Sequence, residues 1–157
     1  MTIAISLSGV LLLVLAAAFD LRERTIPNGI CVALAAVGVV RLLILMSSLE
    51  TGAMLGGLLD VIASGCLFFV GAGLFAAGCL GGGDVKLQAA AALWLGWQQV
   101  PEFLFAMTVS GGVLALVFLA SHTFARASEG PSANPDMPKL PYGFAIAVGG
   151  LFAVASI

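Results

Sequence analysis

The stretch Gly81-Gly82-Gly83-Asp84-Val85-Lys86-Leu87 interrupts a chain that is otherwise mostly apolar. Three glycines, a carboxylate and an ammonium group lie together between two long apolar runs, which places them at or near a membrane surface. An ionisable residue in such a position is by default a functional-site hypothesis, and glycines before it let backbone, solvent or substrate approach closely. We therefore interpret the rest of the chain as the scaffold that holds Asp84 and brings it a partner.

The composition indicates an integral membrane protein. Of the 157 residues, 61% are hydrophobic and 9% are charged, and the mean hydropathy is +1.16, whereas a soluble domain carries about 25% charged residues. The length predicts a single domain, residues 1–157, with room for about six membrane-spanning helices. The net charge of −2 gives no basic surface for nucleic acid. Three cysteines and one histidine lack any metal-ligand spacing, so we expect neither a metal nor a cofactor.

Six apolar segments predict an all-α protein with six transmembrane helices, because in lipid each segment must satisfy its own backbone polar groups. The first segment carries no Lys or Arg, so we interpret it as a retained helix rather than a removable signal peptide. Trp94 and Trp97 are expected near the outer interface, where indole rings are favoured. A polar, proline-rich loop is expected over residues 123–139. The predicted spans are residues 2–19, 29–47, 55–79, 84–100, 102–122 and 140–157.

The positive charges predict the orientation in the membrane. Five of the six basic residues fall in the first, third and fifth loops, and the even loops carry acidic residues instead. The positive-inside rule assigns the basic side to the cytoplasm, so both chain ends are expected outside. Arg41 and Asp60 are the charges left inside apolar segments, at similar depth on consecutive helices. We predict a structural Arg41–Asp60 ion pair, or else two side chains that reach separately to the outer headgroups.

Asp20 ends the first span and Asp84 begins the fourth, both at the predicted cytoplasmic boundary. Two neighbouring carboxyls cannot both ionise easily, so one keeps a proton. One can then act as a general base on water and the other as a general acid toward a carbonyl. From the helix ends alone, Asp20 at a C-terminus is predicted to hold the shared proton and Asp84 at an N-terminus to be the anion. The alternative is that Asp20 belongs to an anchoring cluster with Arg22, Glu23 and Arg24.

Three stretches resemble the motifs of one family, the type IV prepilin peptidases. The segment from Phe19 to Asn28 resembles their first aspartate motif, and Gly81 to Leu87 is similar to their Gly-x-Gly-Asp motif. Leu140-Pro141-Tyr142-Gly143 is similar to a Pro-Tyr-Gly stretch that opens the last helix of the family. The resemblance covers essentially the whole chain, and the order of the motifs makes it specific.

The resemblance implies a membrane aspartic endopeptidase that cleaves the basic leader from type IV prepilins at the cytoplasmic face of a prokaryotic inner membrane. Asp20 and Asp84 are then the catalytic pair. The expected partners are a prepilin, the lipid bilayer and pilus-assembly machinery. The chain looks like the short peptidases of tight-adherence pilus systems or their archaeal relatives for preflagellins. It lacks the N-terminal cysteine domain of the long members, so methylation is not predicted.

Seven further residues are predicted to bind substrate or shape the site. Pro27 stops the first helix and Asn28 caps the second. Lys86 is expected to stabilise an ionised Asp84, or to contact backbone or phospholipid, and acidic groups are expected to meet the basic leader. The full set is Gly81, Gly83, Lys86, Glu23, Pro27, Asn28 and Tyr142.

Two other classes of function remain open at this point. A small transporter or proton-relay subunit would line a path with Arg41, Asp60 and Asp84, which requires charges at many depths. This chain concentrates its charges at one face instead. A non-catalytic pilus-assembly subunit would keep the fold and lose an aspartate, and both aspartates are present.

Overall fold

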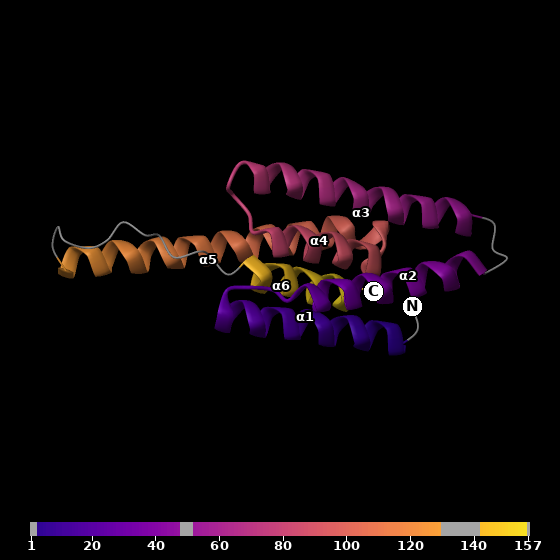
Figure 1. The fold of residues 1–157 in the computed structure, drawn as a ribbon, viewed down its shortest axis with the longest axis horizontal. Helices are drawn as coiled ribbons and strands as arrows, with labels where there is room; N and C mark the ends of the chain where they lie inside the picture. Colours follow the sequence, from indigo (N-terminus) through magenta and orange to yellow (C-terminus); the bar gives the residue numbers. More distant parts are fainter. Residues whose placement is uncertain (1–2, 48–51, 130–141, 157) are drawn as a thin grey trace.

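The computed structural model describes residues 3–47, 52–129 and 142–156, and this part of the chain is helical with no strand. The prediction of an all-α fold is confirmed. The described residues form six α-helices and one short 3₁₀ helix, and Figure 1 shows how the α-helices are arranged. In chain order they are α1 (Ile3–Glu23), α2 (Asn28–Ser47), α3 (Ala53–Ala76), α4 (Gly82–Leu95), η1 (Trp97–Gln99), α5 (Val100–Glu129) and α6 (Tyr142–Ala155).

Four segments of the described chain are long and apolar enough to cross a membrane: α1, α2, α3 and Trp97–Ser121, which includes most of α5. The chain is thus a multi-pass membrane protein. The helix α6 is apolar but shorter, with 14 residues. The helix α4 also has 14 residues, which gives about 21 Å against a hydrocarbon core of about 30 Å. The predicted fourth span therefore starts where expected but ends at Leu95 rather than near residue 100.

The short helix α4 is the core around which the bundle is built. It packs against α2, α3 and α6, and most of its residues are buried. Trp94 is fully buried, and its Nε1 donates to the carbonyl of Ile5 at 3.0 Å. A Cβ at Gly9 would overlap the Trp94 ring, so this glycine lets α1 approach α4 closely. Trp94 is therefore enclosed by neighbouring helices, whereas Trp97 is 41% exposed.

The predicted Arg41–Asp60 ion pair is present and secures the turn from α4 to α5. Arg41 Nη1 donates to Asp60 Oδ2 at 2.7 Å, and the backbone N–H of Trp97 donates to Asp60 Oδ1 at 2.8 Å. Asp60 is only 1% exposed, so both its oxygens need these partners. Gly96 adopts φ 91°, a left-handed conformation that favours glycine. The break thus falls at Gly96, and Pro101 lies in the first turn of α5, where proline is tolerated.

The helix α5 is longer than the sequence predicted. Its 30 residues span about 45 Å, and Figure 1 shows its far end projecting beyond the other helices. The proline-rich loop therefore does not begin at residue 123, because residues 123–129 contain no proline or glycine and the helix continues to Glu129. The rest of the predicted loop lies outside the described residues.

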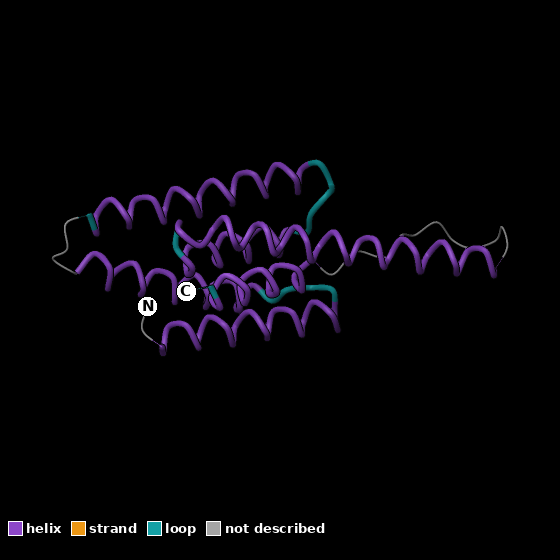
Figure 2. The backbone as a smooth tube through the Cα atoms, turned by 180° about the vertical axis from the view of Figure 1, so that it is seen from behind, coloured by secondary structure: helices purple, strands orange, loops and turns teal. Residues whose placement is uncertain are grey.

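The helices alternate in direction, so the two ends of the bundle differ. Figures 1 and 2 show the α1–α2 and α3–α4 connections at one end and both chain termini at the other. The end of α1, the start of α4 and the start of α6 consequently share one end. This arrangement brings the first aspartate, the glycine stretch and the last helix together.

Candidate active site

Asp20 lies in the last turn of α1 and is 5% exposed. The first turn of α6 surrounds its carboxylate: the N–H of Gly143 donates to Oδ2 at 2.7 Å, and the N–H of Phe144 also bonds to Asp20. A Cβ at Gly143 would come within 2.8 Å of Oδ2 and 2.9 Å of Cγ. Glycine at this position therefore allows the helix start to close over the carboxylate.

Asp84 is the third residue of α4 and is 9% exposed. Its Oδ2 accepts the N–H of Gly81 at 3.2 Å, and its own N–H donates to the Gly81 carbonyl at 3.1 Å. These reciprocal bonds close the first turn of α4 and fix the carboxylate beside the turn. The chain enters this turn from Gly78, whose φ of 74° ends α3 in the left-handed conformation.

The glycines of the Gly81–Leu87 stretch have close neighbours inside the protein. A Cβ at Gly81 would lie 2.8 Å from Asp84 Oδ2, and a Cβ at Gly83 would lie 3.2 Å from the Cβ of Ile26. Sequence reasoning expected these glycines to admit a substrate backbone. In the structure the space beside them is taken by the Asp84 carboxylate and by the α1–α2 connection.

The two carboxyls interact electrostatically. Asp84 lies at the end of the bundle, outside the four membrane-spanning segments. Burial raises its pKa from 3.8 to about 6, with a further contribution from the negative charge of Asp20, while the Gly81 hydrogen bond lowers it. A buried carboxyl next to a second carboxyl is the arrangement in which one group of a pair retains a proton.

Lys86 and Asn28 form a tether between helices rather than the contacts expected of them. Lys86 Nζ donates to Asn28 Oδ1 at 2.9 Å, which links the starts of α2 and α4. Among the described residues the salt bridge found is Arg41–Asp60, so Lys86 does not pair with Asp84 there. At the start of α2 the backbone N–H of Ile30 bonds to the Pro27 carbonyl, and the Asn28 side chain points to Lys86 instead of capping the helix.

The remaining predicted residues lie at the same end of the bundle as Asp20 and Asp84. Glu23 is an exposed residue at the end of α1, and Pro27 precedes α2 in the same connection. Tyr142 lines a neighbouring cavity. Sequence reasoning assigned no role to Gly143, although its position beside Tyr142 at the start of the last span was a usable signal. No group of three or more His, Cys, Asp or Glu residues able to hold a metal occurs in the described part of the chain.

The comparisons with known proteins identify the family. The model of the type IV leader peptidase family matches residues 7–116, a range that includes Asp20 and Asp84. The chain is 30% identical over 76 residues to a prepilin leader peptidase/N-methyltransferase of Legionella pneumophila. It is 33% identical over 75 residues to one of Pectobacterium carotovorum subsp. carotovorum.

Each of these two alignments covers 48% of this chain and 23% of the relative, so the chain matches under a quarter of the length of these proteins. No solved structure matches the chain. The family match, in contrast, extends over well more than half of the chain. The chain therefore belongs to the type IV leader peptidase family.

Proposed function

We propose that this protein is a membrane aspartic endopeptidase that removes the basic leader from type IV prepilins or prepilin-like proteins. The observation that carries the proposal is the pair of buried, electrostatically coupled carboxyls, Asp20 from α1 and Asp84 from α4. Both fall inside the range that matches the leader peptidase family. The two bacterial relatives are named as prepilin leader peptidases, which supports the choice of substrate.

The contacts favour Asp20 as the ionised member and make Asp84 the carboxyl that takes up the shared proton more readily. Asp20 accepts a short bond from the first turn of α6, where a helix N-terminus stabilises negative charge. Asp84 accepts one longer bond, and its pKa is raised to about 6. This is the reverse of the assignment predicted from the helix ends, since the dipole of α6 acts on Asp20 in addition to that of α1.

The chemistry follows from these two states. Ionised Asp20 takes a proton from water as the water oxygen attacks the scissile carbonyl, and Asp84 gives its proton to the carbonyl oxygen. The resulting tetrahedral diol collapses when Asp20 passes its proton to the amide nitrogen and Asp84 takes one back from a hydroxyl. The carbon–nitrogen bond then breaks, and both carboxyls return to their starting states.

The substrate has two chemically different parts that fit two parts of the molecule. A basic leader meets the acidic pair and exposed Glu23 at the end of the bundle, while the apolar segment after the cleaved bond lies against membrane-spanning helices. Arg22 and Arg24 share this end, so the positive-inside rule supports cleavage at the cytoplasmic face. The bilayer and pilus-assembly machinery are the further partners of the proposal.

Co-expression with a candidate prepilin tests the function, with leader removal followed as a mobility shift on a gel. Asp20→Asn and Asp84→Asn should each lower cleavage by about 10²–10⁴-fold, the range for loss of a general acid or base. Each asparagine keeps an oxygen that accepts the Gly143 or Gly81 N–H, so protein levels should be unchanged. Glu102→Gln, an exposed change at the start of α5, should cleave normally. Wild-type cleavage by either asparagine variant would show that the pair is not catalytic.

A further inference from the structure

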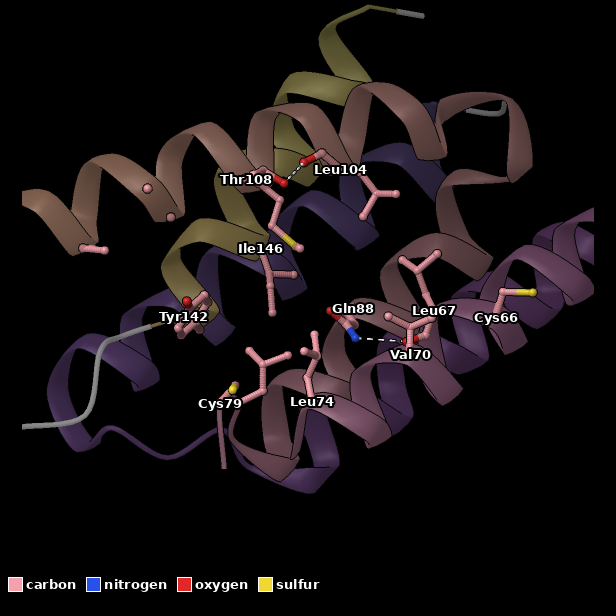
Figure 3. A pocket seen from close by; sticks show the side chains of 15 residues that line it. Cys66, Leu67, Val70, Leu74, Cys79, Gln88, Leu104, Thr108, Tyr142 and Ile146 are labelled. Atoms are coloured by element: carbon pink, nitrogen blue, oxygen red, sulfur yellow. Dashed lines mark hydrogen bonds between the residues drawn. The ribbon is translucent and has the colours of Figure 1, made fainter. Parts of the chain in front are cut away.

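A cavity of about 570 Å³ lies beside the carboxyl pair, and the proposed chemistry does not use it. Residues of α3 and α5 form its sides, α4 contributes Gln88, and α6 contributes Tyr142 and Ile146. Figure 3 shows its mostly aliphatic lining. Val70 and Leu74 line it while being 65% and 43% exposed, so the cavity is a groove open on the α3 side.

One end of this groove coincides with both halves of the site. Leu80 lines the groove and directly precedes Gly81, whose N–H bonds to Asp84. Tyr142 lines it too and directly precedes Gly143, whose N–H bonds to Asp20. A substrate chain that extends from the carboxyl pair into the bundle would therefore enter this apolar groove.

Gln88 places one oriented polar group in the groove, one turn beyond Asp84 on α4. Its Nε2 donates to the carbonyl of Leu67 on α3 at 3.1 Å. A Cβ at Gly71 would overlap Nε2, so the glycine creates the space for this bond. With the nitrogen held, the Gln88 oxygen points away from α3 (Figure 3), and no partner for it occurs among the described residues.

We propose that this groove receives the first turns of the substrate's apolar transmembrane helix, just after the scissile bond; the inference rests on the proposed function. The groove is mostly apolar, is lined largely by α3 and α5, and has one end beside the carboxyl pair. The first N–H groups of any helix lack partners within the helix, and leaving them unpaired among apolar side chains is costly. The Gln88 oxygen supplies an acceptor for one of them.

Photo-crosslinking in the Asp84→Asn variant tests occupancy without requiring cleavage. A benzoylphenylalanine replaces Val70 in the groove or, as the control, Val61, an exposed α3 residue outside it. The probe is a model substrate with a basic leader followed by an apolar helix of about 20 residues. The expected result is a strong crosslink to the substrate from position 70 and a weak one or none from position 61. Equal crosslinks, none, or crosslinks to lipid alone would overturn the proposal.

A second measurement fills the groove in the active enzyme. Gly112 lines the groove and Gly65 does not, and a Cβ at either would meet no atom within 4 Å. Gly112→Leu should raise KM for the model substrate about tenfold or more with little change in kcat, the pattern for lost uniform binding. Gly65→Leu should leave both values within about twofold. A KM unchanged by Gly112→Leu would overturn the proposal that the groove binds the substrate helix.

The two failures are distinguishable. Absence of leader removal with a position-70 crosslink present would count against the proposed peptidase activity and leave the groove in place. Normal leader removal without that crosslink would retain the peptidase and reject the groove.

Discussion

Asp20 and Asp84 are the same side chain in different surroundings, and those surroundings assign their roles. The sequence placed each at a helix end on one side of the membrane, where the two helices can bring them together, and in the structure the charge of Asp20 helps to raise the pKa of Asp84. It did not reveal that α6 donates to Asp20, because Gly143 and Asp20 are 123 positions apart in the chain. The protonation state of a buried carboxyl depends on hydrogen-bond donors that are distant in the sequence as well as on its own helix.

The raised pKa of Asp84 predicts a pH-dependent stability. A carboxyl whose pKa rises from 3.8 to about 6 on folding binds its proton more tightly in the folded state. Its contribution to stability is therefore greatest below pH 3.8, declines as the pH rises to about 6 and is constant above that. Asp84→Asn removes this cost, so at pH 7 the variant should have a free energy of unfolding higher by about 3 kcal/mol. At pH 3.5 the two proteins should be nearly equal.

Thermal or denaturant unfolding in detergent micelles across pH 3.5–8 measures this difference. The matched control is Glu102→Gln, since Glu102 is an exposed residue in the first turn of α5. Its difference from wild type should change little with pH. A stability gain for Asp84→Asn that is the same at pH 3.5 and pH 7 would mean that ionisation of Asp84 carries no cost in the folded protein.

At the scale of elements, α4 shows what the pattern of apolar residues can and cannot predict. Its start at the glycine stretch was predicted, because glycine and a carboxylate mark the helix N-terminus. The burial of α4 was not predicted. Tryptophan is typical of a membrane interface, yet Trp94 is fully buried, because Gly9 on α1 and Gly38 on α2 leave room for α4 to pack closely against both helices. Small residues on a partner helix decide whether a large side chain meets lipid or protein, and one segment read alone does not contain that information.

The contact between α6 and α1 yields a mutational prediction. Gly143→Ala would place a methyl group against the Asp20 carboxylate, with closest approaches of 2.8–3.0 Å to Oδ2, Cγ and Cβ. Either the side chain turns away or α6 retreats and loses its bond to Oδ2. Because a displacement of about 1 Å in a catalytic group costs roughly 10²-fold, kcat should fall by about that factor while the protein still accumulates in membranes.

Gly29→Ala is the control for this change. Gly29 lies in the first turn of α2 at the same end of the bundle, and a Cβ there would meet nothing within 4 Å. This variant should keep wild-type activity and gain up to about 1 kcal/mol in stability, as alanine is favoured over glycine within helices. Equal activity of the two alanine variants would mean that the contact between α6 and Asp20 is not needed for the function of Asp20.

At the scale of the whole molecule, the alternation of helices was predictable because each long apolar segment must cross and return. The lengths of the connections were harder to predict. The helix α5 continues well past residue 123, where the loop was expected to start, since residues 123–129 contain no proline or glycine. The alternation places the end of α1 and the start of α4, which carry Asp20 and Asp84, at one end, and the start of α1 and the end of α6 at the other (Figure 1). Which end faces the cytoplasm is predicted from charge, with Arg22, Arg24 and Lys86 at the carboxyl end, whereas Arg41, beside the turn after α4, is paired with Asp60.

Single-cysteine labelling in intact bacterial cells tests that orientation. The background carries alanine at the three native positions, Cys31, Cys66 and Cys79. Thr25→Cys then marks the α1–α2 connection and Gln98→Cys marks η1 at the opposite end, both at exposed positions. A membrane-impermeant maleimide should label position 98 in intact cells and position 25 only after permeabilisation. The reverse pattern would place the carboxyl pair outside the cytoplasm, where a basic leader that has not crossed the membrane does not reach it. Labelling thus decides whether the proposed site and the uncleaved substrate share a compartment.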